Sequence, residues 1–177
     1  MPTPQGSRGA ALACRAQKGS VDLMKIERAD IYSAESGQLI AELWAEVDRI
    51  YGNREPTKPD VTGMDEAGAA FLIARETGGP IGCVALRPLS PEIAEVKRMY
   101  VRPAARRTGV ARLLMQRLEE IARANGFREI WLETGLGQPA AIRLYESLGY
   151  ERIASFGDYA HDPVSVCYGK RLVGAVS

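Results

Sequence analysis

Apolar side chains recur every three or four residues in three segments of the chain, a spacing that places them on one face of an α-helix. The first segment begins after residue 35 and ends at residue 50, the second covers residues 109–125, and the third covers residues 138–148. Gly126 and Gly149 come directly after the second and third segments, where glycine commonly ends a helix. Pro139 stands at the first helical position of the third, where its missing N–H does no harm. The pattern predicts three amphipathic helices.

Short apolar or alternating runs between these helices predict the strands of a sheet. They cover residues 25–29, 69–76, 80–87, 93–101, 130–134, 150–154 and 164–172. Thr77-Gly78-Gly79 between two of the runs indicates a hairpin. The helix over residues 109–125 predicts that the strand after it is parallel to the strand before it. We therefore expect an α/β protein with a mixed sheet between helices, and a loop over residues 155–163.

The run over residues 93–101 carries apolar side chains on both faces, as a strand covered on both sides requires. Simple alternation divides its side chains between the two faces. One face would carry Glu95, Lys97, Met99 and Val101, and the other Val96, Arg98 and Tyr100.

The elements follow one another without an internal repeat or linker, so residues 24–173 are expected to form a single domain. Residues 1–23 carry proline, glycine, serine and glutamine around a short apolar patch at residues 10–14. This patch is shorter than the core of a typical signal peptide. We expect a disordered N-terminal extension, with a short helix over residues 10–18 as the alternative.

Composition excludes several classes of function. A net charge of +1 over 177 residues argues against a nucleic-acid-binding protein, which needs a basic excess. The three cysteines lie far apart and form no C-x-x-C pair, so neither a disulfide framework nor a metal site is indicated. No apolar run approaches the roughly 20 residues that span a bilayer. We expect a cytoplasmic protein without a membrane role.

The turn between the strand at residues 93–101 and the helix that follows predicts a phosphate site. Backbone N–H groups of residues 107–111 would converge at the positive end of the helix, and Arg106 and Arg107 would add mobile positive charge. Gly109 permits a close approach or a positive φ. The alternative is an ordinary helix start with two solvated arginines. Neither a G-x-x-x-x-G-K-[ST] nor a G-x-G-x-x-G motif is present, so an NTPase or a dinucleotide enzyme is not indicated.

Three sequence blocks together resemble the GNAT superfamily of acetyl-CoA-dependent N-acetyltransferases. They are the run over residues 94–101, the turn Arg106-x-x-Gly109-x-Ala111, and the run over residues 141–150 that contains Leu144-Tyr145-Glu146. The resemblance extends from about Met24 to Leu172. The family's turn often has glycine where this chain has Arg107 and Ala111. The resemblance implies the acyl-CoA N-acyltransferase fold, with a mostly antiparallel mixed sheet and helices on both faces.

The resemblance implies acetyl-CoA as the co-substrate, without a metal, and a primary amine on a small molecule or peptide as the acceptor. The pantetheine arm would pair with the strand around residues 99–101 like an added strand, and a backbone N–H near Met99 would bind the oxyanion. The residues expected to bind the cofactor are Met99, Tyr100, Val101, Arg106, Arg107, Thr108, Gly109, Val110, Ala111, Gln138 and Ala141.

Glu95 and Tyr145 are the catalytic residues that the resemblance implies. Glu95 occupies the place where many family members carry a general base, which would deprotonate the amine directly or through water. The alternative for Glu95 is an ion pair with Lys97, Arg98 or a neighbouring strand. Tyr145 would protonate the departing thiolate, and its alternative is a core tyrosine with the hydroxyl at the edge.

Other residues give weaker predictions. His161 stands in a loop that borders the acceptor site in the family, although a surface position is the more usual one. Cys83 and Cys167 are expected in the core, which disfavours an acetyl-cysteine intermediate and favours direct transfer in a ternary complex. An acidic group could attract a cationic acceptor or merely solvate the surface; it comprises Asp48, Glu55, Asp60, Asp65 and Glu66.

Three questions stay open at this stage. The chain could instead be an acyl-CoA-binding regulatory module without turnover, or an acyltransferase that uses another acyl-CoA or attacks a hydroxyl. Dimerisation through the closing strands or the first helix is common in the family, so a homodimer is an alternative to a monomer.

Overall fold

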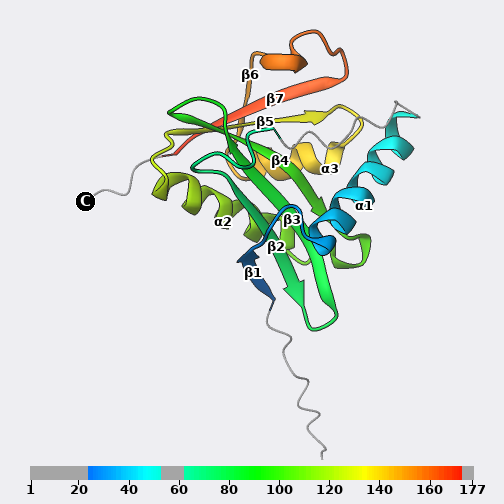
Figure 1. The fold of residues 1–177 in the computed structure, drawn as a ribbon. Coiled ribbons are helices and arrows are strands. Elements are labelled where there is room, and N and C mark those ends of the chain that lie inside the picture. The colour runs from blue at the N-terminus through cyan, green and yellow to red at the C-terminus, as the bar shows by residue number, and fades with distance from the viewer. Residues whose placement is uncertain (1–23, 53–61, 173–177) are drawn as a thin grey trace, which may run out of the picture.

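Seven strands form one sheet in the computed structural model, which describes residues 24–52 and 62–172 (Figure 1). The strand order is β1-β2-β3-β4-β5-β7-β6, and only the β4–β5 pair is parallel. The strands are β1 (Lys25–Arg28), β2 (Ala70–Glu76), β3 (Gly79–Pro88), β4 (Ile93–Val101), β5 (Glu129–Gly135), β6 (Glu151–Ile153) and β7 (Ser165–Arg171). The predicted mixed, mostly antiparallel sheet is confirmed. The extension predicted over residues 1–23 lies outside the described residues.

Among the residues that the structure describes, three α-helices cover the sheet on both faces, as predicted. They are α1 (Ala34–Tyr51), α2 (Val110–Ala124) and α3 (Pro139–Ser147). Side chains of α2 and α3 share one hydrophobic cluster with the sheet, and those of α1 share a second cluster on the opposite face. Two short 3-10 turns, η1 (Pro103–Ala105) and η2 (Gly157–Tyr159), complete the fold. The second of them lies in the segment that was expected to be a plain loop.

Local sequence signals explain where the helices begin and end. The Ser33 side chain accepts a hydrogen bond from the Ser36 N–H and caps α1. Gly126 and Gly149 have φ values of +87° and +83°, so each takes the left-handed conformation that follows a helix. None of the helices in residues 24–52 and 62–172 is long and apolar enough to cross a membrane.

A β-bulge at Arg98 interrupts β4. Cys83 of β3 pairs with Tyr100 and Ala85 pairs with Lys97, so β4 has two residues where β3 has one. Arg98 takes a φ of +56°, in the left-handed region that few residues other than glycine adopt.

The bulge reverses the alternation of side chains beyond it, so the predicted division of faces is wrong for the second half of β4. Met99 and Val101 belong with the cluster under α2, together with Val96. Tyr100 packs in the cluster under α1. Arg98 also faces α1, with its guanidinium 5.2 Å from the ring centre of Trp44. The extra residue moves each later side chain to the other face.

β4 and β5 pair over a short length and then diverge. Their parallel register runs from Ile93 opposite Glu129 to Val96 opposite Leu132 and extends no further. Both strands continue beyond this point, β4 to Val101 and β5 to Gly135. Figure 1 shows the strand ends separating, with α1 and α3 on either side of the opening. The edge of β4 that faces this opening therefore has no strand to pair with.

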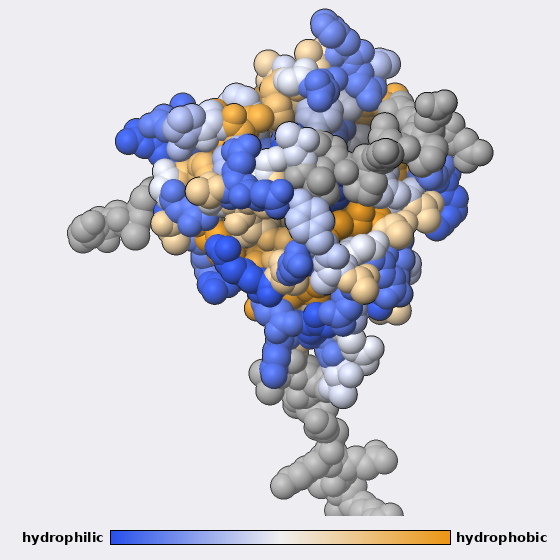
Figure 2. Space-filling view, in the orientation of Figure 1, coloured by the Kyte–Doolittle hydropathy of each residue, from blue (hydrophilic) through white to orange (hydrophobic). Residues whose placement is uncertain are grey.

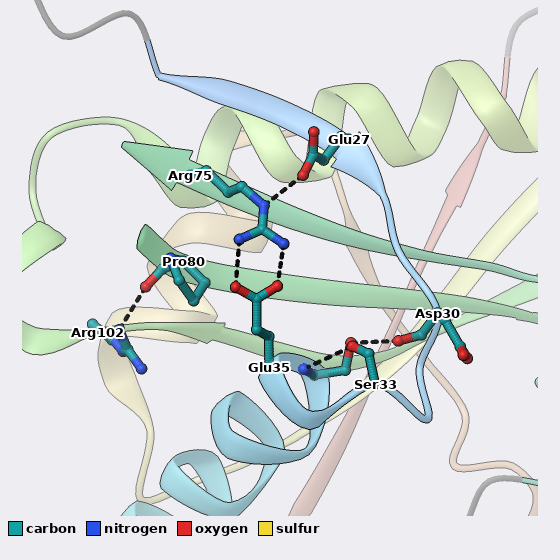
Figure 3. A network of polar contacts seen from close by, with 8 residues as sticks. Glu27, Asp30, Ser33, Glu35, Arg75, Pro80 and Arg102 are labelled. Carbon is teal, nitrogen blue, oxygen red and sulfur yellow. Dashed lines mark hydrogen bonds and ion pairs between the residues drawn. The ribbon is translucent and has the colours of Figure 1, made fainter. Parts of the chain in front are cut away.

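Ion pairs fix α1 against the sheet (Figure 3). Arg75 of β2 bonds to Glu27 of β1 and to Glu35 in the first turn of α1. Arg102, which directly follows β4, donates to the carboxylate of Glu42 in α1 at 2.7 and 2.9 Å. It also donates to the Pro80 carbonyl. Glu35 and Glu42 are seven residues apart, so the two contacts hold the same face of α1 at two successive places along the helix.

A buried ion pair holds α2 on the sheet. Glu119, only 4% exposed, accepts hydrogen bonds of 2.8 Å at both oxygens from Lys170 of β7. Arg123, one turn later on α2, lies 3.2 Å from the same carboxylate. Figure 2, in the orientation of Figure 1, shows hydrophilic and hydrophobic residues interspersed over the visible face of the molecule.

Removal of Lys170 alone should destabilise the fold because it leaves the Glu119 carboxylate buried with one partner fewer. We expect Lys170→Met to lower the free energy of unfolding by about 2–4 kcal/mol. The double variant Glu119→Leu/Lys170→Met should recover most of this loss, since no charge stays buried. Arg117→Met, which breaks an exposed pair, should change stability by less than about 0.5 kcal/mol. Urea unfolding measures all three, and additive losses in the double variant would contradict the interpretation.

Candidate active site

A cavity of about 120 Å³ occupies the opening between β4 and β5. Its walls come from α1, β4, β5, the start of α3 and η2. The lining residues are Leu43, Val47, Val96, Lys97, Arg98, Met99, Glu133, Thr134, Gln138, Tyr145 and Tyr159. Met99, Gln138 and Tyr145 were predicted for the site from the sequence, and the structure brings them together. The other residues were not predicted.

The turn before α2 presents unpaired N–H groups at the helix start. Arg107 and Gly109 have φ values of +66° and +92°, and Gly109 is the N-cap residue. The Thr108 hydroxyl closes the turn by donating to the Ala105 carbonyl at 2.7 Å. Within the described part of the chain, the N–H groups of residues 107–112 have no hydrogen-bond acceptor. Such a set of donors at the positive end of a helix suits an anion.

The two arginines of the turn differ in their contacts. Arg106 donates to the Val101 carbonyl at 2.9 Å and forms an ion pair with Glu46 of α1. Its guanidinium is therefore held toward α1, and the expectation of a mobile charge is wrong for this residue. Arg107 is exposed to solvent. Only Arg107 has the side-chain freedom that the phosphate prediction assumed.

Glu95 is 1% exposed and does not line the cavity. Arg87 of β3 donates to its Oε2 at 2.7 Å, and Lys97 Nζ lies 3.5 Å from its Oε1. The Tyr159 hydroxyl donates to the same Oε1 at 3.2 Å and itself accepts a hydrogen bond from Lys97. The alternative of ion pairs with Lys97 and a neighbouring strand is therefore present in the structure. A path from the cavity to Glu95 leads through Tyr159.

Glu133 of β5 is the carboxylate that faces the cavity, and sequence reasoning missed it. Burial raises its pKa, against the opposing effects of Lys97 and of the Ser165 hydroxyl, which donates to Oε1 at 2.6 Å. The sequence alone could not identify Glu133 as a cavity residue. Alternation along β5 shows which side chains share a face, but it does not show at which end of the strand β5 separates from β4.

Lys97 and Tyr159 form the polar wall of the cavity with Glu133. Burial lowers the pKa of the Lys97 ammonium, although the nearby Glu95 opposes this effect. Burial also raises the pKa of the Tyr159 phenol, so the hydroxyl keeps its proton near neutral pH. Both residues can thus exchange hydrogen bonds with a polar ligand.

Tyr145 of α3 is 4% exposed and lines the cavity. Its ring packs edge-on against Tyr150 at 6.0 Å, so the packing role and the cavity role coexist. Burial raises the pKa of the phenol, with a smaller contribution from Glu133. The hydroxyl is therefore protonated near neutral pH, as a proton donor must be.

Several predicted cofactor residues have side chains directed away from the cavity. Tyr100 packs under α1, and Val101 and Val110 lie in the core beside α2. Ala141 packs against that core from α3. Gln138 is the N-cap residue of α3 but makes no side-chain capping bond. A ligand in the opening could therefore contact Tyr100, Val101, Val110 and Ala141 only through their backbone or a small part of the side chain.

The remaining candidates do not line the cavity. His161 is exposed, and Cys83 and Cys167 are buried as predicted. Burial raises the pKa of Cys83 to about 12, and its thiol donates to the Arg98 carbonyl within the bulge. Asp65 accepts from Tyr32 in a separate hollow of about 240 Å³.

The acidic group predicted for the acceptor is therefore not gathered at the cavity. Asp65 lies in the separate hollow, while Glu55 and Asp60 lie outside the described residues. No set of three histidine, cysteine or acidic residues in residues 24–52 and 62–172 could hold a metal ion.

An open groove of about 1090 Å³ lies at the other end of β4 and β5, where the two strands begin. It is larger than the cavity, but none of the predicted catalytic or cofactor-binding residues lines it. The arginines along it, Arg123, Arg128 and Arg171, each pair with a glutamate. The smaller cavity is therefore the better candidate for chemistry.

Comparisons with known proteins agree with the fold and the motifs. Residues 36–150 match the family described as "Acetyltransferase (GNAT) family". The IAA acetyltransferase of Azospirillum brasilense is 36% identical over 138 residues, which cover 75% of this chain and 90% of that protein. The Escherichia coli protein YjgM, described as an uncharacterized N-acetyltransferase, is 33% identical over 127 residues, which cover 70% of this chain and 74% of YjgM.

Solved structures show the same architecture. A structure described as an acyl-CoA N-acyltransferase from Klebsiella pneumoniae superposes with a TM-score of 0.72 and 30% identity, covering 85% of this chain and 98% of that one. The Salmonella typhimurium protein yncA, solved with its cofactor acetyl-CoA, gives a TM-score of 0.66 at 21% identity, covering 87% of this chain and 96% of that one. At that identity the second likeness concerns the fold alone.

Gly109→Ala should destabilise the turn, because an L-residue at this positive φ is strained even though no atom lies within 4 Å of the added methyl group. The expected loss is about 1–2 kcal/mol of unfolding free energy. Gly37→Ala in α1 is a matched control with equally open space and no positive φ, and it should gain about 0.5–1 kcal/mol. Chemical denaturation of both variants gives the comparison. A loss of the same size in both would contradict the strain argument.

Glu133→Gln should become more stable relative to the wild type as pH rises from 4 to 7. The raised pKa of Glu133 means that its contribution to stability is present at low pH and is lost as pH rises through the folded-state value. Glutamine does not titrate and avoids this loss. Melting midpoints at pH 4, 5.5 and 7 measure the trend. It should exceed the trend of Glu151→Gln, an exposed position on β6, and a flat or falling difference would refute the burial effect.

Proposed function

Because the chain belongs to the GNAT acetyltransferase family, we propose that it transfers the acetyl group of acetyl-CoA to a primary amine by direct attack in a ternary complex. The observation that supports this proposal most strongly is the divergence of β4 and β5 beside the turn that starts α2. One opening thus combines an unpaired strand edge, a set of free N–H donors and a cavity with titratable walls.

The described residues fit acetyl-CoA in three places. The free N–H groups of residues 107–112 suit the pyrophosphate, with Arg107 as an added charge. The unpaired edge of β4 at residues 99–101 offers backbone groups to the amides of the pantetheine arm. The cavity between Met99, Glu133 and Tyr145 is then the place for the acetyl group. Bound acetyl-CoA supplies the activated thioester, and the remaining steps belong to the side chains.

Glu133 is the better placed of the two glutamates to take the proton of the amine. It lines the cavity, and its raised pKa brings it closer to the working pH of a base. Glu95 is enclosed by Arg87, Lys97 and Tyr159, so a base role for Glu95 requires the Tyr159 hydroxyl as a relay. We assign Glu95 to positioning of Lys97 and Tyr159, and we retain its base role as the alternative that mutagenesis distinguishes.

The chemical step balances with these groups. The amine loses one proton to Glu133, and its lone pair attacks the thioester carbonyl carbon. The negative charge on the carbonyl oxygen is stabilised by a backbone N–H near Met99. The C–S bond then breaks, and the thiolate takes a proton from the Tyr145 hydroxyl. The acetylated nitrogen releases its remaining extra proton to the Tyr145 phenolate, and Glu133 passes its proton to solvent. The products are the N-acetylated amine and CoA.

An assay of CoA release from acetyl-CoA with a panel of primary amines tests the function. Glu133→Gln and Tyr145→Phe should each lower kcat by about 100-fold or more, whereas acetyl-CoA should still raise the melting midpoint of both variants. Glu95→Gln should lower kcat less than Glu133→Gln does. Arg117→Met, which breaks an exposed ion pair on α2, is the control and should match the wild type.

Three results would change the assignment. Stabilisation by acetyl-CoA without CoA release from any amine would indicate a regulatory acyl-CoA-binding module. Faster release from a longer acyl-CoA would indicate a different donor. A larger loss of kcat in Glu95→Gln than in Glu133→Gln would return the base role to Glu95.

A further inference from the structure

The hydrophobic stripe of α1 is longer than the sheet beneath it. At the start of the stripe, Leu39 and Ile40 are buried with exposures of 0% and 5%. Leu43 and Trp44, one turn later, are only partly buried against the same cluster. Val47 follows them, and Ile50 at the end of the stripe is 41% exposed. The C-terminal half of α1 therefore carries an apolar face that the sheet does not cover.

This uncovered face continues the wall of the cavity. Leu43 and Val47 line the cavity itself, and Ile50 lies on the same face of the helix, three residues further on. We name Val47, Ile50 and Leu136 the apolar rim. Leu136 lies in the β5–α3 loop and is 52% exposed. A Cβ on its neighbour Gly137 would lie 2.8 Å from Ile50 Cγ2, so the loop and the helix are in direct contact.

Glycine in the β5–α3 loop allows this contact. A Cβ on Gly135 would stand 1.7 Å from the Tyr51 hydroxyl, and the Gly137 N–H donates to that hydroxyl at 3.2 Å. The end of α1 thus rests on the loop at the mouth of the cavity. Ile50 thus lies against the loop that carries Leu136, although these two exposed members of the rim are 86 positions apart in the chain.

The opposite wall of the cavity is polar and carries both signs of charge. Glu133 is placed to receive an ammonium proton, while Lys97 would repel a second positive charge on the same ligand. Among residues 24–52 and 62–172, Glu133 is the one acidic residue that lines the cavity, and Asp65 pairs with Tyr32 elsewhere.

We propose that the acceptor is a primary amine carried on an apolar group, whose hydrocarbon part packs on the apolar rim while its nitrogen faces Glu133. This inference rests on the proposed acetyl transfer and adds the chemical class of the acceptor. Continuity between the rim and the cavity carries it, because a ligand whose amine enters the cavity must leave its substituent at the mouth. An amine with a second cation would place that charge against hydrocarbon or near Lys97.

Four amino acid amides test the proposal, because they share the reacting group and differ in the side chain. They are glycinamide, leucinamide, phenylalaninamide and argininamide. The wild type should use leucinamide and phenylalaninamide with a kcat/KM at least about tenfold above that of glycinamide, the discrimination that a hydrophobic pocket typically provides. Argininamide should not share this advantage, although its side chain is long, because its guanidinium adds a second positive charge.

Variants then locate the preference on the rim. Ile50→Ser/Leu136→Ser should reduce the ratio of phenylalaninamide to glycinamide to within about threefold, mainly through KM for the apolar amine. Leu89→Ser removes a leucine of similar exposure, 40%, from the β3–β4 loop and should leave the ratio unchanged. Stabilisation of both variants by acetyl-CoA shows that they remain folded and keep the cofactor site.

The outcomes separate this inference from the proposed function. Turnover with equal or better use of glycinamide or argininamide would overturn the apolar acceptor and leave acetyl transfer intact. A ratio that survives the double variant would do the same. Absence of turnover with every amine would contradict acetyl transfer. In that case the melting midpoint of the protein with CoA present tests the acceptor class separately. Phenylalaninamide should raise this midpoint more than glycinamide does, and equal shifts would overturn the inference.

Discussion

The separation of β4 from β5 is the constraint on which the rest of the structure depends. Hydrogen bonding between the two strands extends only to Val96 and Leu132, and the bulge at Arg98 follows two residues later. A parallel pair that continued to the strand ends would fill the opening, cover the edge of β4 and leave no cavity. The bulge strains one residue, and the contacts of Cys83 with its carbonyl and of Trp44 with its side chain hold that residue in place. In return, an internal strand acquires a free edge, which sheets rarely leave open without a partner.

Electrostatics around this opening follow from how each group is buried. Glu95 is enclosed but surrounded by donors, so its charge is compensated within the protein. Glu133 is buried with fewer compensating contacts, and its pKa is raised as a result. Two glutamates on adjacent strands thus have different surroundings, and on this ground we propose a positioning role for Glu95 and proton transfer for Glu133. The same reasoning separates Arg106, which pairs with Glu46, from the exposed Arg107 in the next position.

Most of the fold could be predicted from the sequence, because periodic apolar residues and terminal glycines are local signals. The positions of α2 and α3, their ends at Gly126 and Gly149, and the β2–β3 hairpin required no tertiary information. The faces of β4 beyond Arg98 could not be predicted, since nothing in a run of alternating residues marks an extra one. In the candidate site, a sequence motif allowed the positive φ of Gly109 and the presence of Tyr145 to be predicted. Glu133, Lys97 and Tyr159 depend on which strand end is open and on how a distant loop folds back, which are tertiary properties.

The central claim is that a ligand completes the edge of β4 and the start of α2 together. Amide hydrogen exchange with and without acetyl-CoA tests it most directly, because it reports which backbone N–H groups become bonded or shielded. The account predicts that acetyl-CoA slows exchange chiefly in residues 99–101 and 107–112, with little change around residues 90–93 and 123–129. Protection centred on the groove where β4 and β5 begin, with residues 107–112 unaffected, would contradict it and move the binding site to the other end of the sheet.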